Sequence, residues 1–291
     1  MIHQVAEATQ DTAVSLDPDS SKARTGPTRH SRLSGTHQRS AESGSVVRAS
    51  SLRATEEPDF LPLNETSPER AVDVILKRRS AQRLDPAFRM SADVFHHLMD
   101  CLLVRRAAPW DVWDFTPRIH LMIFIHRVDG LEPGLYAFVR RSGAEKLLQS
   151  ALNPEFLWQR PDATPRHLPL FLLQKADCRQ AARTVNCHQA IASDGCFSIA
   201  MLSEFEGIVA SDPWRYRQLH WEAGLIGQIL YLEAEAAGLR GTGIGCYFDD
   251  AIHEILGIGD SAFASLYHFT VGSPILDERI LTLPPYPERH L

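Results

Sequence analysis

The fold of this chain follows from residues 216–237, which read YRQLHWEAGLIGQILYLEAEAA. Apolar side chains wrap almost completely around this stretch at helical spacing, which predicts a central helix buried on several sides. Ala223, Gly224 and Gly227 leave one part of the helix nearly free of side chains, so that another backbone could approach it closely. Gly238 follows at the position where a left-handed residue ends a helix.

Further helices and strands are predicted before and after this helix. Ser91 is a helix N-cap ahead of an apolar stripe, and Ser67 with Pro68 begins an earlier helix. Short β-branched and aromatic runs predict strands at residues 119–125, 135–139, 195–201 and 266–271. Because strands and helices do not alternate regularly, the chain is predicted to have an α+β fold.

Composition excludes several classes of protein. The 291 residues are 44% hydrophobic and 23% charged, as in an ordinary globular chain. Lys and Arg number 30 against 36 Asp and Glu, and this net charge of −6 disfavours nucleic acid as a partner. No apolar run is long enough to span a membrane. Five cysteines without a CxxC pair indicate reduced thiols and a cytoplasmic protein.

The first 59 residues differ in composition from the rest. No aromatic residue occurs before Phe60, and the segment is rich in Ser, Thr, Arg and Ala without a sustained helical or strand period. We therefore expect residues 1–59 to be a disordered N-terminal extension and residues 60–291 to form the folded domain.

A basic motif, Lys77-Arg78-Arg79-Ser80, ends the first predicted helix. Guanidinium groups bind phosphate through paired donors and a serine hydroxyl adds another, so the motif suits a phosphate-bearing cofactor. The alternative is that these cations only face the negative C-terminal end of the helix.

A glycine motif, Gly241-Thr242-Gly243-Ile244-Gly245-Cys246, follows the central helix. Glycines remove side chains from a turn, so that backbone N–H groups can face a ligand closely. It is not a dinucleotide-binding fingerprint, because it follows a helix and has the spacing GxGxG. The alternative is a tight loop without a ligand.

Cysteine and histidine recur at Cys178, Cys187, His188 and Cys196. These are metal-ligand types, although their spacing is not that of a zinc module. A metal or redox-sensing module and ordinary buried cysteines are both open interpretations.

Three aromatic residues, Trp110, Trp113 and Phe115, precede the strand predicted at residues 119–125. They either line a pocket for a planar ligand or belong to the core.

In order and spacing, these motifs resemble the nitroreductase superfamily of FMN flavoproteins, and more closely its SagB-like branch, which is related to thiazoline/oxazoline dehydrogenases. The resemblance covers roughly Ser67 to Pro285. It rests on Lys77 to Ser80, Pro133-Gly134-Leu135-Tyr136, Glu222 to Gln228 leading to Leu239, Gly243 to Gly245 with Phe248-Asp249-Asp250, and Val271-Gly272-Ser273-Pro274.

The resemblance implies a mainly antiparallel sheet flanked by helices, and a homodimer with FMN at the interface beside the central helix. Arg78 and Ser80 would hold the phosphate and ribityl chain, Arg279 would be a second phosphate cation, and the N–H groups of Gly245 and Cys246 would face the flavin N5/O4 edge. The implied cofactor-binding set is Arg78, Arg79, Ser80, Gln82, Gly243, Gly245, Cys246 and Arg279.

The implied activity is two-electron (hydride) transfer between a nicotinamide, NAD(P)H, or a peptide-derived donor and a small acceptor. The flavin carries the chemistry, so no catalytic side chain is assigned. The chain departs from the family pattern at Gln82, where a Lys or Arg is usual, and in the segment from Pro109 to Trp113. It also lacks a Lys-Tyr dipeptide. A catalytically degenerate flavin-binding partner in a biosynthetic cluster is the alternative.

Overall fold

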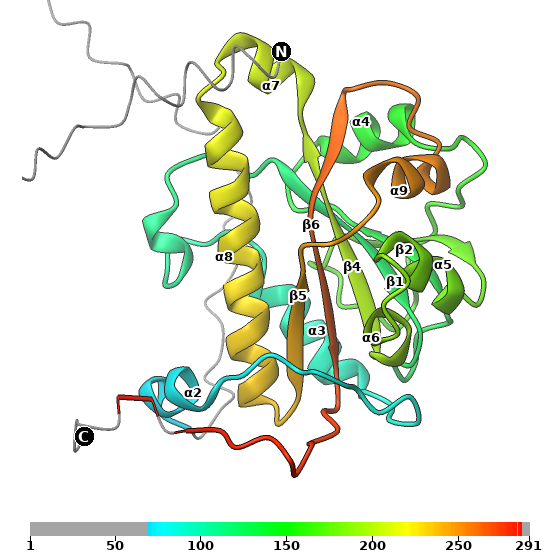
Figure 1. Ribbon diagram of the computed structural model, residues 1–291. Coiled ribbons are helices and arrows are strands. Elements are labelled where there is room, and N and C mark those ends of the chain that lie inside the picture. The colour runs from blue at the N-terminus through cyan, green and yellow to red at the C-terminus, as the bar shows by residue number, and fades with distance from the viewer. Residues whose placement is uncertain (1–68, 284, 287–291) are drawn as a thin grey trace, which may run out of the picture.

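The computed structural model describes residues 69–283 and 285–286 (Figure 1). In chain order the elements are α2 (Ala71–Lys77), α3 (Ala92–Cys101), the 3-10 helix η1 (Trp110–Val112), β1 (Ile119–Ile125), β2 (Gly134–Phe138), α4 (Ala144–Ala151), β3 (Leu170–Lys175), α5 (Arg179–Val185), α6 (Ile191–Asp194), β4 (Phe197–Glu204), α7 (Glu206–Ser211), α8 (Arg215–Ala236), β5 (Arg240–Ile244), α9 (Asp249–Leu256) and β6 (Phe263–Gly272).

The strands form one six-stranded sheet in the order β3-β2-β1-β4-β6-β5, and every neighbouring pair is antiparallel. The prediction for residues 119–125 is confirmed at both ends, while β2, β4 and β6 begin or end a few residues away from the predicted limits. Strands β3 and β5 were not predicted. The α+β fold with an antiparallel sheet is confirmed.

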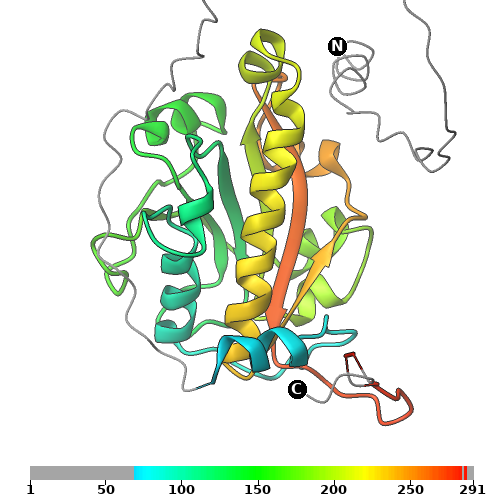
Figure 2. The same ribbon diagram turned by 90° about the vertical axis from the view of Figure 1, so that its left-hand side faces the viewer.

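Helices cover both faces of the sheet, and each face has its own hydrophobic core. Alternate residues of β1 point to opposite faces, so Leu121 and Ile123 pack with α3 and α8, whereas Met122 and Phe124 pack with α4, α5 and α9. Figures 1 and 2 show α8 lying along one face of the sheet, with α2 against its C-terminal end. The strands are therefore buried between two helical layers.

Helix α8 is held on the sheet by a buried ion pair. The Glu222 carboxylate accepts hydrogen bonds from the Arg140 guanidinium and from the Arg118 N–H, the latter at 2.9 Å. Both charged side chains are almost fully buried. Since an unpaired buried charge is costly, this pair specifies where α8 sits.

The two glycines of α8 that were predicted to admit another backbone differ in their surroundings. A Cβ at Gly227 would lie 3.1 Å from the Tyr267 ring, so this glycine admits a side chain of β6 rather than another backbone. Gly224 has open space around it, and the neighbouring Trp221 is 54% exposed. The described residues thus leave one face of α8 uncovered, at Trp221 and Gly224.

Helix ends agree only in part with the predicted caps. Ser91 caps α3, its hydroxyl accepting from the Val94 N–H at 3.4 Å, and Gly238 adopts a φ of +72° after α8. Helix α2 begins after Arg70, which makes no side-chain cap. The predicted cap at Ser67 and the domain boundary at residues 59 and 60 lie outside the described residues.

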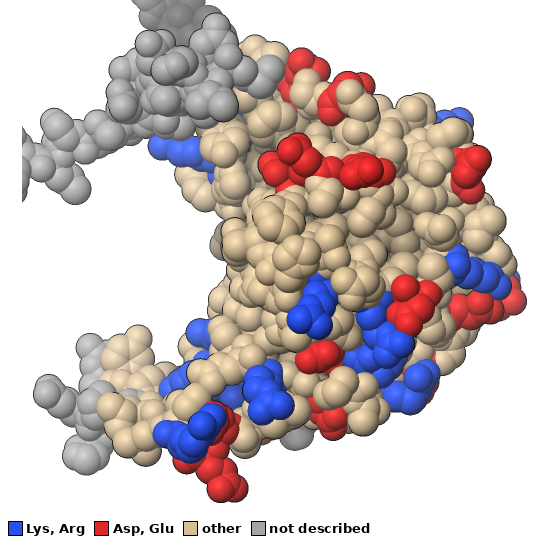
Figure 3. Space-filling model, turned by 45° about the vertical axis from the view of Figure 1, so that its right-hand side comes forward, with Lys and Arg blue, Asp and Glu red and all other residues tan. Residues whose placement is uncertain are grey.

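Basic and acidic side chains are interspersed over the face in Figure 3. Exposed ion pairs include Lys175 with Glu132 at 3.0 Å and Arg89 with Asp129 at 2.7 Å. That face therefore carries a mixed charge rather than a basic stripe. Among the described helices, none has both the length and the apolar character needed to cross a membrane.

Candidate functional site

Tyr231 of α8 joins three of the residues singled out in the sequence. Its hydroxyl accepts a hydrogen bond from the Gly243 N–H at 2.8 Å and lies 2.9 Å from the Ser80 Oγ. The Arg78 guanidinium lies over the Tyr231 ring, 4.7 Å from its centroid. This cation–π contact orients Arg78 at the end of α2. We call Arg78, Ser80, Tyr231 and Gly243 the tyrosine hub.

The chain after α2 is fixed along the outer edge of β5. The Ala81 N–H donates to the Gly241 carbonyl at 3.1 Å, and the Thr242 hydroxyl donates to the Ala81 carbonyl at 2.6 Å. Strand β5 is the last strand of the sheet, so this segment covers an edge that would otherwise be unpaired. These bonds place the basic motif beside the glycine motif.

The glycine motif is a strand over most of its length, and the predicted turn is wrong there. A Cβ at Gly241 would overlap the Phe269 ring, and one at Gly243 would overlap the Tyr267 side chain, so rings of β6 require both glycines. Gly245, just past the strand, has no neighbour near its Cβ position among the described residues and is exposed. Backbone approach to a ligand is therefore open at Gly245.

A hollow of about 330 Å³ lies along α8 next to the hub. It shares Tyr231 with the hub and is lined by His220, Ala223, Gly224, Gly227, Gln228, Tyr231, Leu266 and Tyr267. Burial lowers the pKa of His220 and raises the pKa of Tyr267, which favours the neutral forms of both. The hollow thus has an uncharged lining, with the Arg78 cation at the hub beside it. Small-ligand pockets combine such apolar walls with few polar groups.

Besides Gly245 and Cys246, three residues of the predicted binding set lie outside the hub. Arg79 donates to the carbonyls of Leu76 and Arg78 at 2.9 and 2.8 Å, so it satisfies the end of α2, as the alternative interpretation of the basic motif has it. Arg279 pairs with Asp277 at 2.6 Å and its side chain is 89% exposed. Gln82 is exposed.

The cysteines are not all reduced, which corrects the sequence prediction. Cys187 and Cys246 form a disulfide across 59 residues, while Cys178 and Cys196 are free and buried. Because Cys187 is bridged to Cys246, the suggested group of Cys178, Cys187, His188 and Cys196 does not form one metal site. The cytoplasmic location was inferred from reduced cysteines, which the disulfide contradicts, so that location stays a prediction.

The aromatic residues before β1 divide between core and surface. Trp110 is buried, donates its indole N–H to the Cys101 carbonyl at 2.8 Å, and packs under the Arg140 guanidinium. Trp113 and Phe115 contact each other edge to face at a centroid distance of 5.3 Å, and Phe115 is exposed. Trp110 is thus a core residue.

Sequence reasoning missed Tyr231 as an organising residue. It was counted among the apolar residues of the central helix, and its hydroxyl partners lie 151 and 12 residues away in the chain. A helical tyrosine among aliphatic residues was the one available signal, since a buried phenol needs a hydrogen-bond partner.

No protein-family model and no curated protein matches the sequence. Solved structures match in fold. A protein of Anabaena variabilis described as a nitroreductase is 24% identical with a TM-score of 0.54, over 70% of this chain and 38% of its own. One of Ralstonia eutropha, described likewise, is 14% identical with a TM-score of 0.50, over 75% of this chain and 89% of its own.

A third match is the Escherichia coli microcin synthetase McbBCD complex with truncated pro-MccB17 bound. It is 14% identical with a TM-score of 0.50, over 83% of this chain and 85% of that one. The chain spans well under half the length of the Anabaena protein. At these identities the likeness concerns the fold, and this chain therefore has the α+β fold of the nitroreductases.

Proposed function

We propose that this chain is an FMN-dependent oxidoreductase that transfers two electrons between a nicotinamide or peptide-derived donor and a small acceptor. One observation carries the proposal: the tyrosine hub holds a cation and a hydroxyl, Arg78 and Ser80, beside an uncharged hollow. FMN has this polarity, with a phosphate at one end and a planar, largely apolar ring at the other.

The residues at the hub suit the tail of FMN. Arg78 supplies paired donors to the phosphate, and Ser80 adds a hydroxyl for the phosphate or ribityl chain. Tyr231 holds both in place. The Gly243 N–H already donates to Tyr231, so Gly243 positions the site rather than contacting the cofactor. Arg279 reaches the phosphate only if it leaves Asp277.

The residues after β5 suit the ring. Gly245 and Cys246 are exposed and Gly245 has open space at its Cβ position, so we assign their backbone N–H groups to the N5/O4 edge. Bound FMN supplies the hydride chemistry. Backbone N–H groups stabilise the negative charge that the ring gains on reduction. Gln82, where the family usually has a cation, stabilises that charge less.

We further propose that two copies of the chain pair across the exposed face of α8. Trp221 and Gly224 lie on this face. A two-fold interface would bury this surface, which is exposed in the single chain. Trp221→Glu is expected to weaken self-association. Gly227→Leu is a poor probe, because its side chain would first collide with Tyr267 inside the chain.

Within this fold we propose the SagB-like branch, on the resemblance at Pro133-Gly134-Leu135-Tyr136, of which Gly134 to Tyr136 lie in β2. The corresponding substrate is small and planar or peptide-derived, with NAD(P)H as the alternative electron source. A catalytically degenerate flavin-binding partner is the second candidate. The match to the microcin synthetase McbBCD complex favours it, as does Gln82.

The test is a visible spectrum followed by anaerobic mixing. The purified chain is expected to be yellow with about one flavin per chain, and NADH or NADPH should bleach it in a stopped-flow instrument. A bound flavin that neither nicotinamide reduces would favour the degenerate partner. A colourless chain that does not take up added FMN would contradict the proposal.

Arg78→Ala tests the placement of the phosphate. Loss of a charged hydrogen bond is expected to weaken FMN binding by about 1.5–3 kcal/mol. Arg179→Ala is the matched control, because Arg179 is an exposed arginine that pairs with Asp177 at the start of α5. Equal FMN affinity in the two variants would show that the phosphate lies elsewhere.

A further inference from the structure

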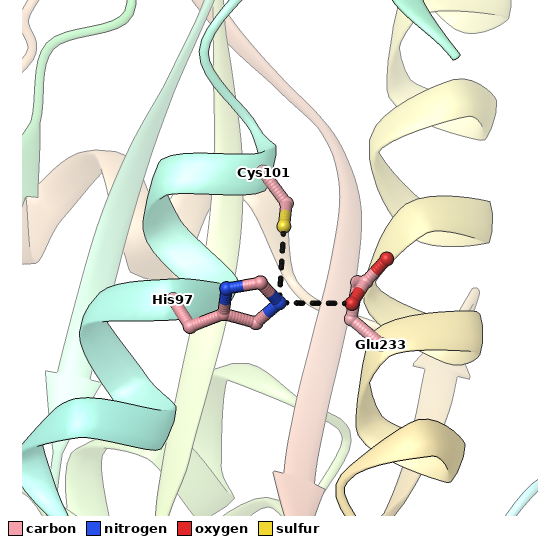
Figure 4. A group of neighbouring side chains, drawn as sticks. All are labelled: His97, Cys101 and Glu233. Atoms are coloured by element: carbon pink, nitrogen blue, oxygen red, sulfur yellow. Dashed lines mark hydrogen bonds and ion pairs between the residues drawn. The ribbon is translucent and has the colours of Figure 1, made fainter. Parts of the chain in front are cut away.

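Three side chains with different donor atoms meet between α3 and α8, and none of them belongs to the tyrosine hub. His97 and Cys101 are four residues apart on α3 and therefore share one face of that helix. Glu233 extends from α8 toward them, as Figure 4 shows. Their nitrogen, sulfur and oxygen donor atoms all lie within 4.8 Å of one another.

Two of the three spacings between these atoms are close to those of ligands around one ion. The Cys101 Sγ lies 3.5 Å from the His97 Nε2, and the Glu233 Oε2 lies 3.1 Å from the same nitrogen. A tetrahedral zinc ion, with Zn–S of about 2.3 Å and Zn–N and Zn–O of about 2.1 Å, sets its ligand atoms about 3.4–3.6 Å apart. Two edges of the tetrahedron are thus within a few tenths of an ångström of that geometry.

Burial and charge fit a divalent ion as well. Cys101 is only 3% exposed, whereas the side chains of His97 and Glu233 are 26% and 33% exposed. The thiol is thus held inside while the other two ligands reach the surface. A thiolate and a carboxylate together neutralise a 2+ ion, so the occupied site carries no net charge. Imidazole and thiolate favour zinc over calcium or magnesium.

A hydrogen bond between His97 and Glu233 is the simpler interpretation of the same contacts. That hydrogen bond explains why the His97 imidazole lies beside the Glu233 carboxylate, but it does not explain why the Cys101 sulfur lies beside the same nitrogen. Cys101 could fill core space in any orientation, yet its Sγ approaches the coordinating nitrogen of His97. Among the described residues, this is the one group of three His, Cys and acidic side chains whose donor atoms lie close enough together to share a metal ion.

We propose that His97, Cys101 and Glu233 bind Zn²⁺, with water completing the tetrahedron on the exposed side. Binding breaks the Cys101 S–H bond, forms the S–Zn bond and releases the thiol proton to solvent. No electron is transferred. The ion ties α3 to α8 across the layer that covers one face of the sheet. None of the three residues belongs to the set proposed to bind FMN.

The experiment uses the full chain with its natural complement of flavin. The protein is stripped with chelator, incubated with equimolar Zn²⁺ and passed through gel filtration, and retained zinc is measured by elemental analysis. About one zinc per chain is expected in the wild type, and less than about a tenth of that in Cys101→Ser and in Glu233→Gln. Cys178→Ser, which changes another buried free cysteine, is expected to retain zinc like the wild type.

Two further readouts separate coordination from misfolding. Zinc is expected to raise the unfolding temperature of the wild type and of Cys178→Ser, but not of Cys101→Ser. Calorimetric titration in buffers of different ionisation enthalpy should show at least about one proton released per zinc in the wild type. Glu233→Gln keeps the size of the side chain, so it tests the site even if Cys101→Ser fails to fold. A wild type without zinc, or zinc retained equally by both site variants, would overturn the proposal.

Discussion

Replacing Tyr231 by Phe tests whether the tyrosine hub organises the cofactor site. The substitution keeps the ring under Arg78 and removes only the hydroxyl. Two contacts are lost, the one with Ser80 at 2.9 Å and the hydrogen bond from the Gly243 N–H at 2.8 Å. Ser80 and the end of β5 then lose their common anchor.

The size of the effect follows from these two bonds. An intramolecular hydrogen bond contributes about 0.5–1.5 kcal/mol net, so the two together contribute about 1–3 kcal/mol. Part of that contribution holds Ser80 in the position where it would contact the cofactor. With about 1.4 kcal/mol per factor of ten, we expect FMN to bind about 5- to 50-fold more weakly.

The assay is a titration of flavin-free chain with FMN, followed by quenching of the flavin fluorescence. Tyr136→Phe is the matched control, because its hydroxyl donates to the Glu132 carbonyl at 2.7 Å and it lies on β2, which is next to β3, the edge strand opposite β5. The control should lose stability but keep its affinity for FMN. If Tyr231→Phe binds FMN as tightly as Tyr136→Phe, the hub does not organise the site.

Three more predictions concern stability and the cysteines. Glu222→Ala leaves the buried Arg140 charge unpaired and should lower the free energy of unfolding by about 3–5 kcal/mol. Calorimetry should then show an unfolding temperature about 6–20 °C lower. Burial lowers the pKa of His268 to about 3, so between about pH 3 and 6.5 the unfolded chain binds a proton that the folded chain does not. The free energy of unfolding measured in urea should therefore fall as the pH drops from about 6.5 toward 3. His268→Gln should make that pH dependence flatter. Thiol titration in denaturant should find three thiols before reduction and five after it, whereas five at the outset would exclude the Cys187–Cys246 bridge.

Local patterns in the sequence were sufficient for much of the fold. The run at residues 119–125 is apolar except for His120 because β1 is buried on both faces, and Ser91 acts on its own helix within one turn. The periodicity of residues 216–237 indicated a helix covered on several sides. Each of these signals lies within the element that it specifies, so no knowledge of distant contacts was needed.

Other features depend on contacts between distant residues. Strand β5 reads as a loop because of its glycines, and only the rings of Tyr267 and Phe269 across the ladder explain them. Helical periodicity likewise predicts that Gly227 is buried, but it does not identify the Tyr267 ring as the group that covers it. The disulfide joins residues 59 positions apart, and no spacing rule predicts that pairing.

The candidate site was predicted as a set of residues but not as an arrangement. Arg78 and Ser80 were found because phosphate chemistry selects those residue types, and they do meet at one place. Arg79 came from the same motif and faces the helix end instead, because adjacent side chains point in different directions. Tyr231 was missed because its role comes from two partners in other elements.

Native mass spectrometry of the chain supplied with FMN tests whether two chains and the cofactor assemble together. We expect one dominant species of two chains and two FMN molecules, and we expect Trp221→Glu to lower the dimer and the bound flavin together. A single chain that retains FMN, or a dimer that carries none, would contradict it.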